Sequence, residues 1–201
     1  MSKILNSIDC PNMPWEEKPE NYPFPVWRYS KNPITKRPYS DKIDRVFNSS
    51  LVKYNDEYIG VFRADSLENK GNLYVGHSKD GINIELEENR IVFFDEEENE
   101  IPLFGTKFDP RVIPMDDRYY VVYCDYTYGV TSAIAWTKDF KHFTKMPNPF
   151  ITNFRNGVLF PRKINGKYYM LIRPCDSGNT KFGNIFISES EELRYWGNND
   201  L

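Results

Sequence analysis

The amino-acid sequence predicts an all-β fold, a partial β-propeller of about three blades. Short apolar strand patterns joined by hairpin turn signals run from residue 46 to the end of the chain. These patterns recur in groups of four at an interval of roughly 50 residues, which is typical of propeller blades. A β-sandwich would have similar strands but not this internal alignment. The expected blades cover about residues 46–95, 105–150 and 155–201.

Residues 1–45 precede the first blade and are expected to form an extended arm. Prolines recur throughout this segment, and a proline supplies no N–H donor to a helix or a sheet. Aromatic residues, among them Trp15, Tyr22 and Trp27, are interleaved with the prolines. They indicate that the arm lies on another surface, which favours this interpretation over a free proline-rich ligand.

Four strands are expected in each blade. In the first blade they cover residues 46–54, 57–63, 72–78 and 82–86. In the second they cover 108–114, 118–124, 132–137 and 143–145, and in the third 157–160, 167–173, 184–188 and 194–196. The second strands align best, with Tyr58, Tyr119 and Tyr168 at one shared position. The turn after each third strand also repeats, as Ser78-Lys79-Asp80, Thr137-Lys138-Asp139 and Ser190-Glu191-Glu192.

Composition excludes several classes of protein. The 26 basic and 29 acidic side chains give a net charge of −3, so nothing favours nucleic acid or an anionic membrane as a partner. The cysteines Cys10, Cys124 and Cys175 are odd in number and widely spaced, which indicates a reducing compartment rather than a disulfide framework or a zinc site. The apolar run at the start of the sequence is too short for a signal peptide. No apolar stretch approaches the ~20 residues that a membrane span requires. We therefore expect a soluble, cytoplasmic protein.

The sequence does not favour a metal site. The acidic run Asp95–Glu100 lacks the alternating ligands and the glycine of a calcium loop, so a solvated loop between blades is the better interpretation. His77 and His142 are isolated from each other and from any ligand motif, and neither is assigned a role.

The first strand of each unit carries polar residues that a packed core would not need. They are Asn48-Ser49-Ser50, Asp109-Pro110-Arg111 and Arg155-Asn156. The innermost strand of a propeller blade lines the central channel, so we expect these residues to lie in it.

Two arginines, Arg63 and Arg173, end the second strands of the outer units, where the middle unit has Cys124. An arginine at the end of an apolar strand is costly to bury unless it meets an anion. The anion could be a ligand, or it could be a neighbouring aspartate such as Asp65 or Asp176. The pattern leaves both interpretations open.

Five ordered segments resemble glycoside hydrolase family 130, the β-mannoside phosphorylases. They are Phe47–Ser49, Phe62–Asp65, Phe108–Arg111, Arg155–Tyr168 and Tyr195–Gly197. The similarity covers about residues 27 to 201. It implies a five-bladed β-propeller, so three blades would be present and two would be missing.

The resemblance also implies a reaction. Members of the family mostly cleave β-mannosides with inorganic phosphate and invert the anomeric centre, which gives α-mannose 1-phosphate. The acid of the Asp-Pro-Arg motif corresponds to Asp109, and it is thought to act through the 3-hydroxyl of the mannosyl unit. Phosphate replaces the activated water of an ordinary inverting enzyme, so no second carboxylate is required.

The remaining site residues follow from the same resemblance. Arg155 and Arg173 correspond to phosphate-binding arginines, and their planar forks suit bidentate contact. Hydrolytic members lack this basic set, which favours phosphorolysis. The residues expected to bind substrate are Asn48, Ser49, Arg63, Asp65, Asn156 and Asp176.

Several expectations concern the whole protein. The family's further lysine, histidine, tyrosine and carboxylate lie in later blades, so the chain is expected to be truncated and to have little activity alone. Inorganic phosphate is a co-substrate, and no cofactor is expected. The aromatic arm could pack on a neighbouring subunit and make the protein a homo-oligomer.

Three alternatives and two choices of substrate stay open. The protein could be a non-catalytic sugar-binding propeller or a β-mannoside hydrolase of the same family. A five-bladed glycosidase with three carboxylates is a third reading, but Asn48 and Arg155-Asn156 stand where two of them are expected. The aglycone could be glucose, mannose or a longer chain, and the linkage is also undecided.

Overall fold

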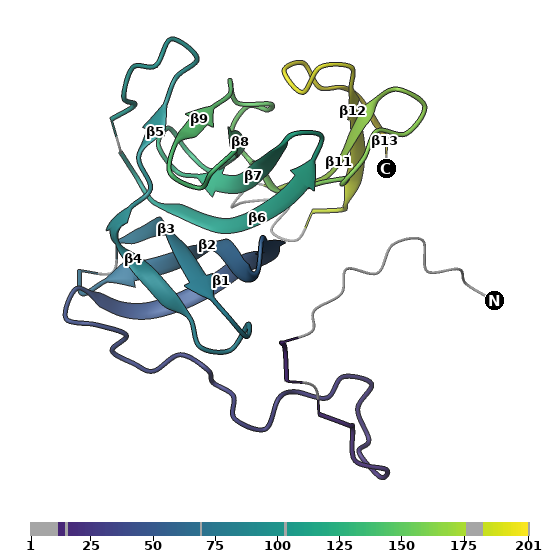
Figure 1. Ribbon diagram of the computed structural model, residues 1–201. Coiled ribbons are helices and arrows are strands. Elements are labelled where there is room, and N and C mark those ends of the chain that lie inside the picture. The colour runs from purple at the N-terminus through teal and green to yellow at the C-terminus, as the bar shows by residue number, and fades with distance from the viewer. Residues whose placement is uncertain (1–11, 15, 69, 103, 176–182, 201) are drawn as a thin grey trace.

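The prediction of an all-β fold is confirmed by a computed structural model, which describes residues 12–14, 16–68, 70–102, 104–175 and 183–200. Every regular element of these residues is a β-strand, and the strands form three sheets (Figure 1). No helix of the described residues is long and apolar enough to cross a membrane.

The first and third sheets each have four antiparallel strands in chain order. The first consists of β1 (Ile43–Tyr54), β2 (Glu57–Ser66), β3 (Gly71–Ser78) and β4 (Glu85–Arg90). The third consists of β10 (Phe154–Leu159), β11 (Tyr168–Pro174), β12 (Phe186–Ser190) and β13 (Gly197–Asp200). Consecutive strands pair as hairpins, which is the simplest meander topology and the one that the turn signals predict.

The second sheet has a fifth strand that the sequence pattern does not predict. Its strands are β5 (Phe93–Phe94), β6 (Lys107–Met115), β7 (Arg118–Asp125), β8 (Thr131–Thr137) and β9 (Phe143–Lys145). The order is β5-β9-β8-β7-β6, and β5 pairs parallel to β9 at the outer edge. A two-residue strand that pairs in parallel has no hairpin turn beside it, so no local signal marks it.

A repeated turn precedes the last strand of each unit. Strands β3, β8 and β12 each end in a residue with a hydroxyl group. This hydroxyl accepts a hydrogen bond from the backbone N–H three residues later. The pairs are Ser78–Gly81 (2.8 Å), Thr137–Phe140 (2.9 Å) and Ser190–Leu193 (3.0 Å). The second residue of each pair has a positive φ, of 73°, 59° and 67° respectively. The alignment of these turns in the sequence is therefore matched by their hydrogen bonds.

This turn corrects the predicted position of the last strand. Residues 194–196 are not a strand, because the chain leaves the turn only after Trp196, and β13 begins at Gly197. The Trp196 Nε1 donates to the Leu193 carbonyl oxygen at 2.9 Å, and its ring lies 6.0 Å from that of Phe150. Trp196 thus closes the turn and packs on the core instead of extending the sheet.

The Asp80 carboxylate supports the first of these turns, and this gives a pH-dependent prediction. Backbone N–H groups of Asn83 and Ile82 donate to it and lower its pKa from 3.8 to about 2. A depressed folded-state pKa adds stability above the unfolded pKa, and that stability is lost as the pH falls toward 2. Asp80→Ala should therefore lower the free energy of unfolding by about 1 kcal/mol at pH 7 and by much less near pH 2. Urea unfolding at both pH values measures this, and an equal loss at both would contradict it.

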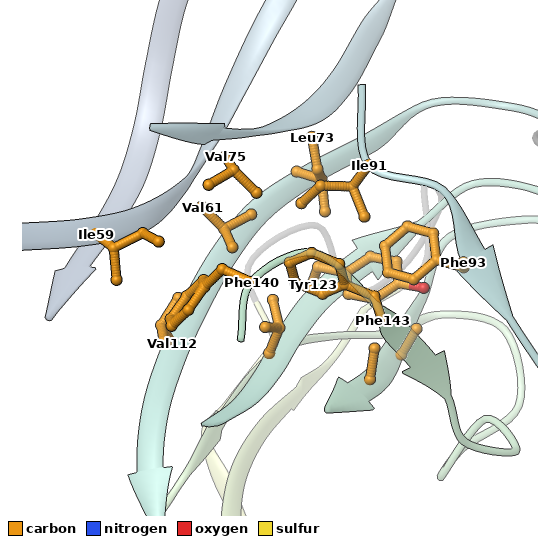
Figure 2. Packing of buried hydrophobic residues seen from close by; sticks show 13 residues of the cluster. Ile59, Val61, Leu73, Val75, Ile91, Phe93, Val112, Tyr123, Phe140 and Phe143 are labelled. Atoms are coloured by element: carbon orange, nitrogen blue, oxygen red, sulfur yellow. The ribbon is translucent and has the colours of Figure 1, made fainter. Parts of the chain in front are cut away.

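The core lies between neighbouring sheets, and β7 faces both interfaces. Val121 and Tyr123 point into a cluster shared with β2 and β3 of the first sheet (Figure 2). Tyr120 and Val122 point into a second cluster, with residues of the third sheet such as Met170. Because strand side chains alternate between faces, a strand buried on both faces reads as a continuous apolar run.

Residues 12–14 and 16–42, the described part of the segment before β1, contain no strand and are mostly exposed. These described residues run away from the first sheet in Figure 1. They are tied to that sheet where the Tyr39 hydroxyl donates to the Ile84 carbonyl oxygen (3.0 Å) and accepts the Leu86 N–H (2.9 Å). An ion pair between Arg37 and Asp44 (3.0 Å) adds to this attachment.

Candidate active site

One strand of each sheet, namely β1, β6 and β10, bulges at the equivalent point. The register shifts between Val46 and Ser49 in β1, between Phe108 and Arg111 in β6, and between Arg155 and Val158 in β10. A bulge leaves its residues without ladder partners and redirects their side chains. The residues at the equivalent bulge positions are Asn48, Asp109 and Asn156.

These bulges bring two amides to the Asp109 carboxylate. The Asn48 Nδ2 donates to Asp109 Oδ1, and the Asn156 Nδ2 donates to Asp109 Oδ2 at 3.3 Å. Asp109 and Asn156 have φ values of 53° and 60°, in the left-handed region that aspartate and asparagine tolerate better than other side chains. The Arg111 Nη1 donates to the backbone carbonyl oxygen of Asp109 at 3.3 Å. The carboxylate is therefore oriented from both neighbouring sheets.

Two arginines meet beside this carboxylate, and neither has an acidic partner among the residues that the structure describes. Arg155 and Arg173 are directly paired across β10 and β11, and both donate to Asn156 Oδ1, at 3.0 and 2.8 Å. No carboxylate oxygen of the described residues lies within 4.0 Å of either guanidinium, and Arg173 Nε is buried without a partner there. Two adjacent cations that share a neutral acceptor form a site for an anion with several oxygen atoms. Asp176, expected to bind substrate, lies outside the described residues.

Arg63 has a different environment. Its Nε and Nη2 lie 3.1 and 3.4 Å from the two carboxylate oxygens of Asp65, which is itself buried. The sequence left open whether Arg63 and Arg173 meet a neighbouring aspartate or the anion of a ligand, and the structure gives the two arginines different answers. Arg63 pairs with an aspartate of its own strand, whereas Arg173 does not pair with any acidic residue that the structure describes.

Two phenylalanine rings lie against the arginines of the site, and the sequence did not lead us to expect these rings there. The Arg63 guanidinium lies over the rings of Phe47 (4.6 Å) and Phe108 (5.6 Å), and that of Arg155 lies over Phe108 at 5.8 Å. Such cation–π contacts favour the charged guanidinium in one orientation. Phe47 and Phe108 both directly precede the bulge residue, so the repeat alignment contains the signal that could have found them.

Cys124 occupies the position in β7 that corresponds to Arg173 in β11. It lies opposite Phe108 and is 1% exposed. Burial raises the pKa of its thiol, and the backbone N–H of Asn156 offsets this only in part. The thiol therefore stays neutral, and β7 has no cation at the position where β11 has Arg173.

Two serines near the bulges differ in role. Ser49 is exposed beside Asn48. The Ser50 hydroxyl accepts the Val112 N–H at 3.0 Å and so links the first sheet to the second. The equivalent link to the third sheet is made by Ser132, whose hydroxyl accepts the Gly157 N–H at 3.2 Å. These two hydrogen bonds join neighbouring sheets next to their bulges, so that residues far apart in sequence form one site.

The sequence profile of glycoside hydrolase family 130, described as β-1,4-mannooligosaccharide phosphorylase, matches residues 9–200. The chain is 44% identical over 202 residues to the β-1,4-mannooligosaccharide phosphorylase of Ruminococcus albus, which covers 98% of this chain and 60% of that protein. It is 35% identical over 128 residues to the β-1,2-mannobiose phosphorylase of Listeria innocua, which covers 62% of this chain and 34% of that protein.

The solved structure of the Listeria innocua β-1,2-mannobiose phosphorylase in complex with β-1,2-mannobiose has the same fold. The match has a TM-score of 0.74 at 22% identity, and it covers 88% of this chain and 66% of that one. The structural relatives of this family are five-bladed β-propellers, so the three sheets correspond to blades of such a propeller. The chain spans about 60% of the length of the Ruminococcus albus relative.

Proposed function

The chain belongs to glycoside hydrolase family 130, and on this basis we propose that it forms part of an inverting β-mannoside phosphorylase. The substrate would be a β-1,4-mannooligosaccharide or mannosyl-glucose, and the product α-mannose 1-phosphate. One observation carries this proposal, namely that Asp109 is held by two amides next to an arginine pair that has no acidic partner in the described chain. The names of the relatives support phosphorolysis of mannosides as the reaction class.

In the proposed mechanism Asp109 supplies the proton. It protonates the 3-hydroxyl of the mannosyl unit, which passes its own proton to the glycosidic oxygen as the bond from that oxygen to the anomeric carbon breaks. A phosphate oxygen attacks the same carbon from the opposite face, so the configuration inverts. The amides of Asn48 and Asn156 keep the Asp109 carboxyl group in one orientation, which a positioned acid requires.

The arginine pair would bind the phosphate. The guanidiniums of Arg155 and Arg173 carry donors in a planar fork that suits phosphate oxygens, and they compensate its negative charge behind the anomeric carbon. Asn48, Ser49, Arg63 and the Asp65 paired with it would hold the mannosyl unit. A hydrolase of the same fold would need no cationic pair at this point, which favours phosphorolysis over the hydrolytic alternative.

We further propose that the rest of the site and the two remaining blades lie outside these 201 residues. The coverage of the Ruminococcus albus relative and the five blades of the structural relatives support this. The proposed protein acts in the cytoplasm, needs phosphate as co-substrate and no other cofactor, and assembles as a homo-oligomer. The free thiols of Cys124 and Cys175 are consistent with a reducing compartment.

The deciding experiment uses the full-length protein that contains this chain. β-1,4-Mannobiose and mannosyl-glucose are each incubated with and without inorganic phosphate, and mannose 1-phosphate is quantified. We expect its release only with phosphate. Cleavage that is independent of phosphate would identify a hydrolase, and binding of the sugars without cleavage would identify a sugar-binding propeller.

Phe108 provides a test of how the two arginine groups are held. Phe108→Leu removes the ring that lies under both Arg63 and Arg155. Each lost cation–π contact is worth about 1 kcal/mol, so the KM values for mannoside and for phosphate should both rise about three- to tenfold. Phe108→Tyr keeps the ring and serves as the control. Unchanged KM values in the leucine variant would show that the ring does not position either arginine.

A further inference from the structure

A cavity apart from the Asp109 site is lined by residues of the second sheet and of the segment that leads into β6. Its volume is about 240 Å³, and its walls are largely aromatic and apolar. Phe104 and Tyr128 stand at its exposed rim, and Tyr123 lies on its buried side, stacked on Phe93 at 5.1 Å (Figure 2). None of these residues takes part in the hydrogen bonds around Asp109, so the cavity is separate from the proposed active site.

Lys107 and Asp125 form an ion pair in this cavity, and their two charges cancel. The Lys107 Nζ lies 2.8 Å from Asp125 Oδ1, and each side chain is 6% exposed. The same ammonium donates to the Phe104 carbonyl oxygen (2.6 Å) and to the Thr127 hydroxyl (2.9 Å). Its three protons are therefore used, and Lys107 has no donor left for a ligand.

Lys145 is the cation that remains. Its Nζ donates to Asn148 Oδ1 at 2.7 Å and to the Met146 carbonyl oxygen at 3.3 Å, which are both neutral acceptors. No carboxylate oxygen of the described chain lies within 4.0 Å of it. Burial lowers the pKa of this ammonium, and the nearby Asp125 carboxylate offsets part of that effect. The cavity thus holds one net positive charge and one free ammonium proton.

Tyr123 adds a second unsatisfied donor. Its side chain is 1% exposed, and its hydroxyl has no hydrogen-bond partner among the residues that the structure describes. Buried hydroxyl groups are rarely left unpaired, so such a group beside a cavity indicates a missing acceptor. The Tyr123 hydroxyl and one proton of the Lys145 ammonium thus have no oxygen partner among the described residues.

We propose that this cavity binds a small organic carboxylate whose body is a single apolar ring. The carboxylate would accept from Lys145 and Tyr123, and the ring would pack on the aromatic wall formed by Phe104 and its neighbours. A neutral sugar would leave the Lys145 charge uncompensated, and an inorganic anion would leave the apolar walls uncovered. The volume is below that of pockets for drug-sized ligands, which restricts the body to about one ring.

Calorimetric titration with benzoate tests this proposal on the full-length protein, with benzyl alcohol as the neutral ligand of the same shape. We expect saturable benzoate binding, and at least tenfold weaker binding of benzyl alcohol. Lys145→Met should weaken benzoate binding at least tenfold. Lys141→Met is the matched control, because it removes an exposed lysine from the preceding turn and should leave binding unchanged.

Each other outcome counts against the proposal. Equal affinity for benzoate and benzyl alcohol would show that no cation takes part, and equal loss in both lysine variants would show a bulk charge effect. The absence of saturable benzoate binding would exclude the site. Tyr123→Phe removes only the hydroxyl, so it keeps the test valid if Lys145→Met fails to fold, and it should weaken binding severalfold. Because the experiment measures benzoate binding, its result does not depend on whether the protein is a mannoside phosphorylase.

Discussion

Asp109→Asn is expected to lower the rate of mannoside phosphorolysis by about 10²–10⁴-fold, because a positioned acid typically contributes that factor. Asparagine keeps the size of the side chain and tolerates the φ of 53° at this position, so the fold should survive. It has no acidic proton to give to the mannosyl 3-hydroxyl. The measurement is kcat for mannose 1-phosphate release by the full-length protein.

Asp116→Asn provides a matched control for that measurement. Asp116 has a φ of 58° and lies in the hairpin between β6 and β7, at the other end of the strand that carries Asp109. Its replacement makes the same chemical change in the same backbone conformation, away from the site. We expect nearly full activity. An active Asp109→Asn variant would favour an acid elsewhere, and equal losses in both variants would show a general effect on the fold.

Asp125→Leu is expected to lower the free energy of unfolding by about 3–5 kcal/mol, because it leaves the buried Lys107 ammonium without its counter-ion. Lys145 would lose a nearby carboxylate at the same time. Urea unfolding of the variant and the wild type measures the difference.

The double variant Lys107→Met/Asp125→Leu separates the charge effect from lost packing. Replacing both members of a buried pair by apolar side chains removes the stranded charge, so the double variant should be more stable than Asp125→Leu alone. Asp117→Ala disrupts an exposed pair with Lys138 and should change stability little. Losses that simply add in the double variant would show that the two charges do not stabilise each other.

Much of the fold could be predicted from local patterns. Hairpin turns and alternating strands depend on residues that are near in sequence, and β2, β7 and β11 were located to within a few residues. The repeated turn at Ser78, Thr137 and Ser190 could be aligned because its hydrogen bond spans only three residues. The errors lie where distant chain segments decide the outcome, as at β5, which pairs across the edge of the second sheet.

The candidate site, like the fold, could be predicted from the sequence only in part. The amino-acid sequence shows which side chains are available, and the family resemblance singled out Asp109, Arg155 and Arg173. Which of these side chains meet depends on the packing of the sheets, because Asn48 and Asn156 contact Asp109 across 61 and 47 residues of chain. The same packing leaves Arg63 paired with Asp65, whereas Arg173 donates to Asn156. Strand formation depends on neighbours in sequence, but a site made by three bulges depends on how three sheets pack against one another.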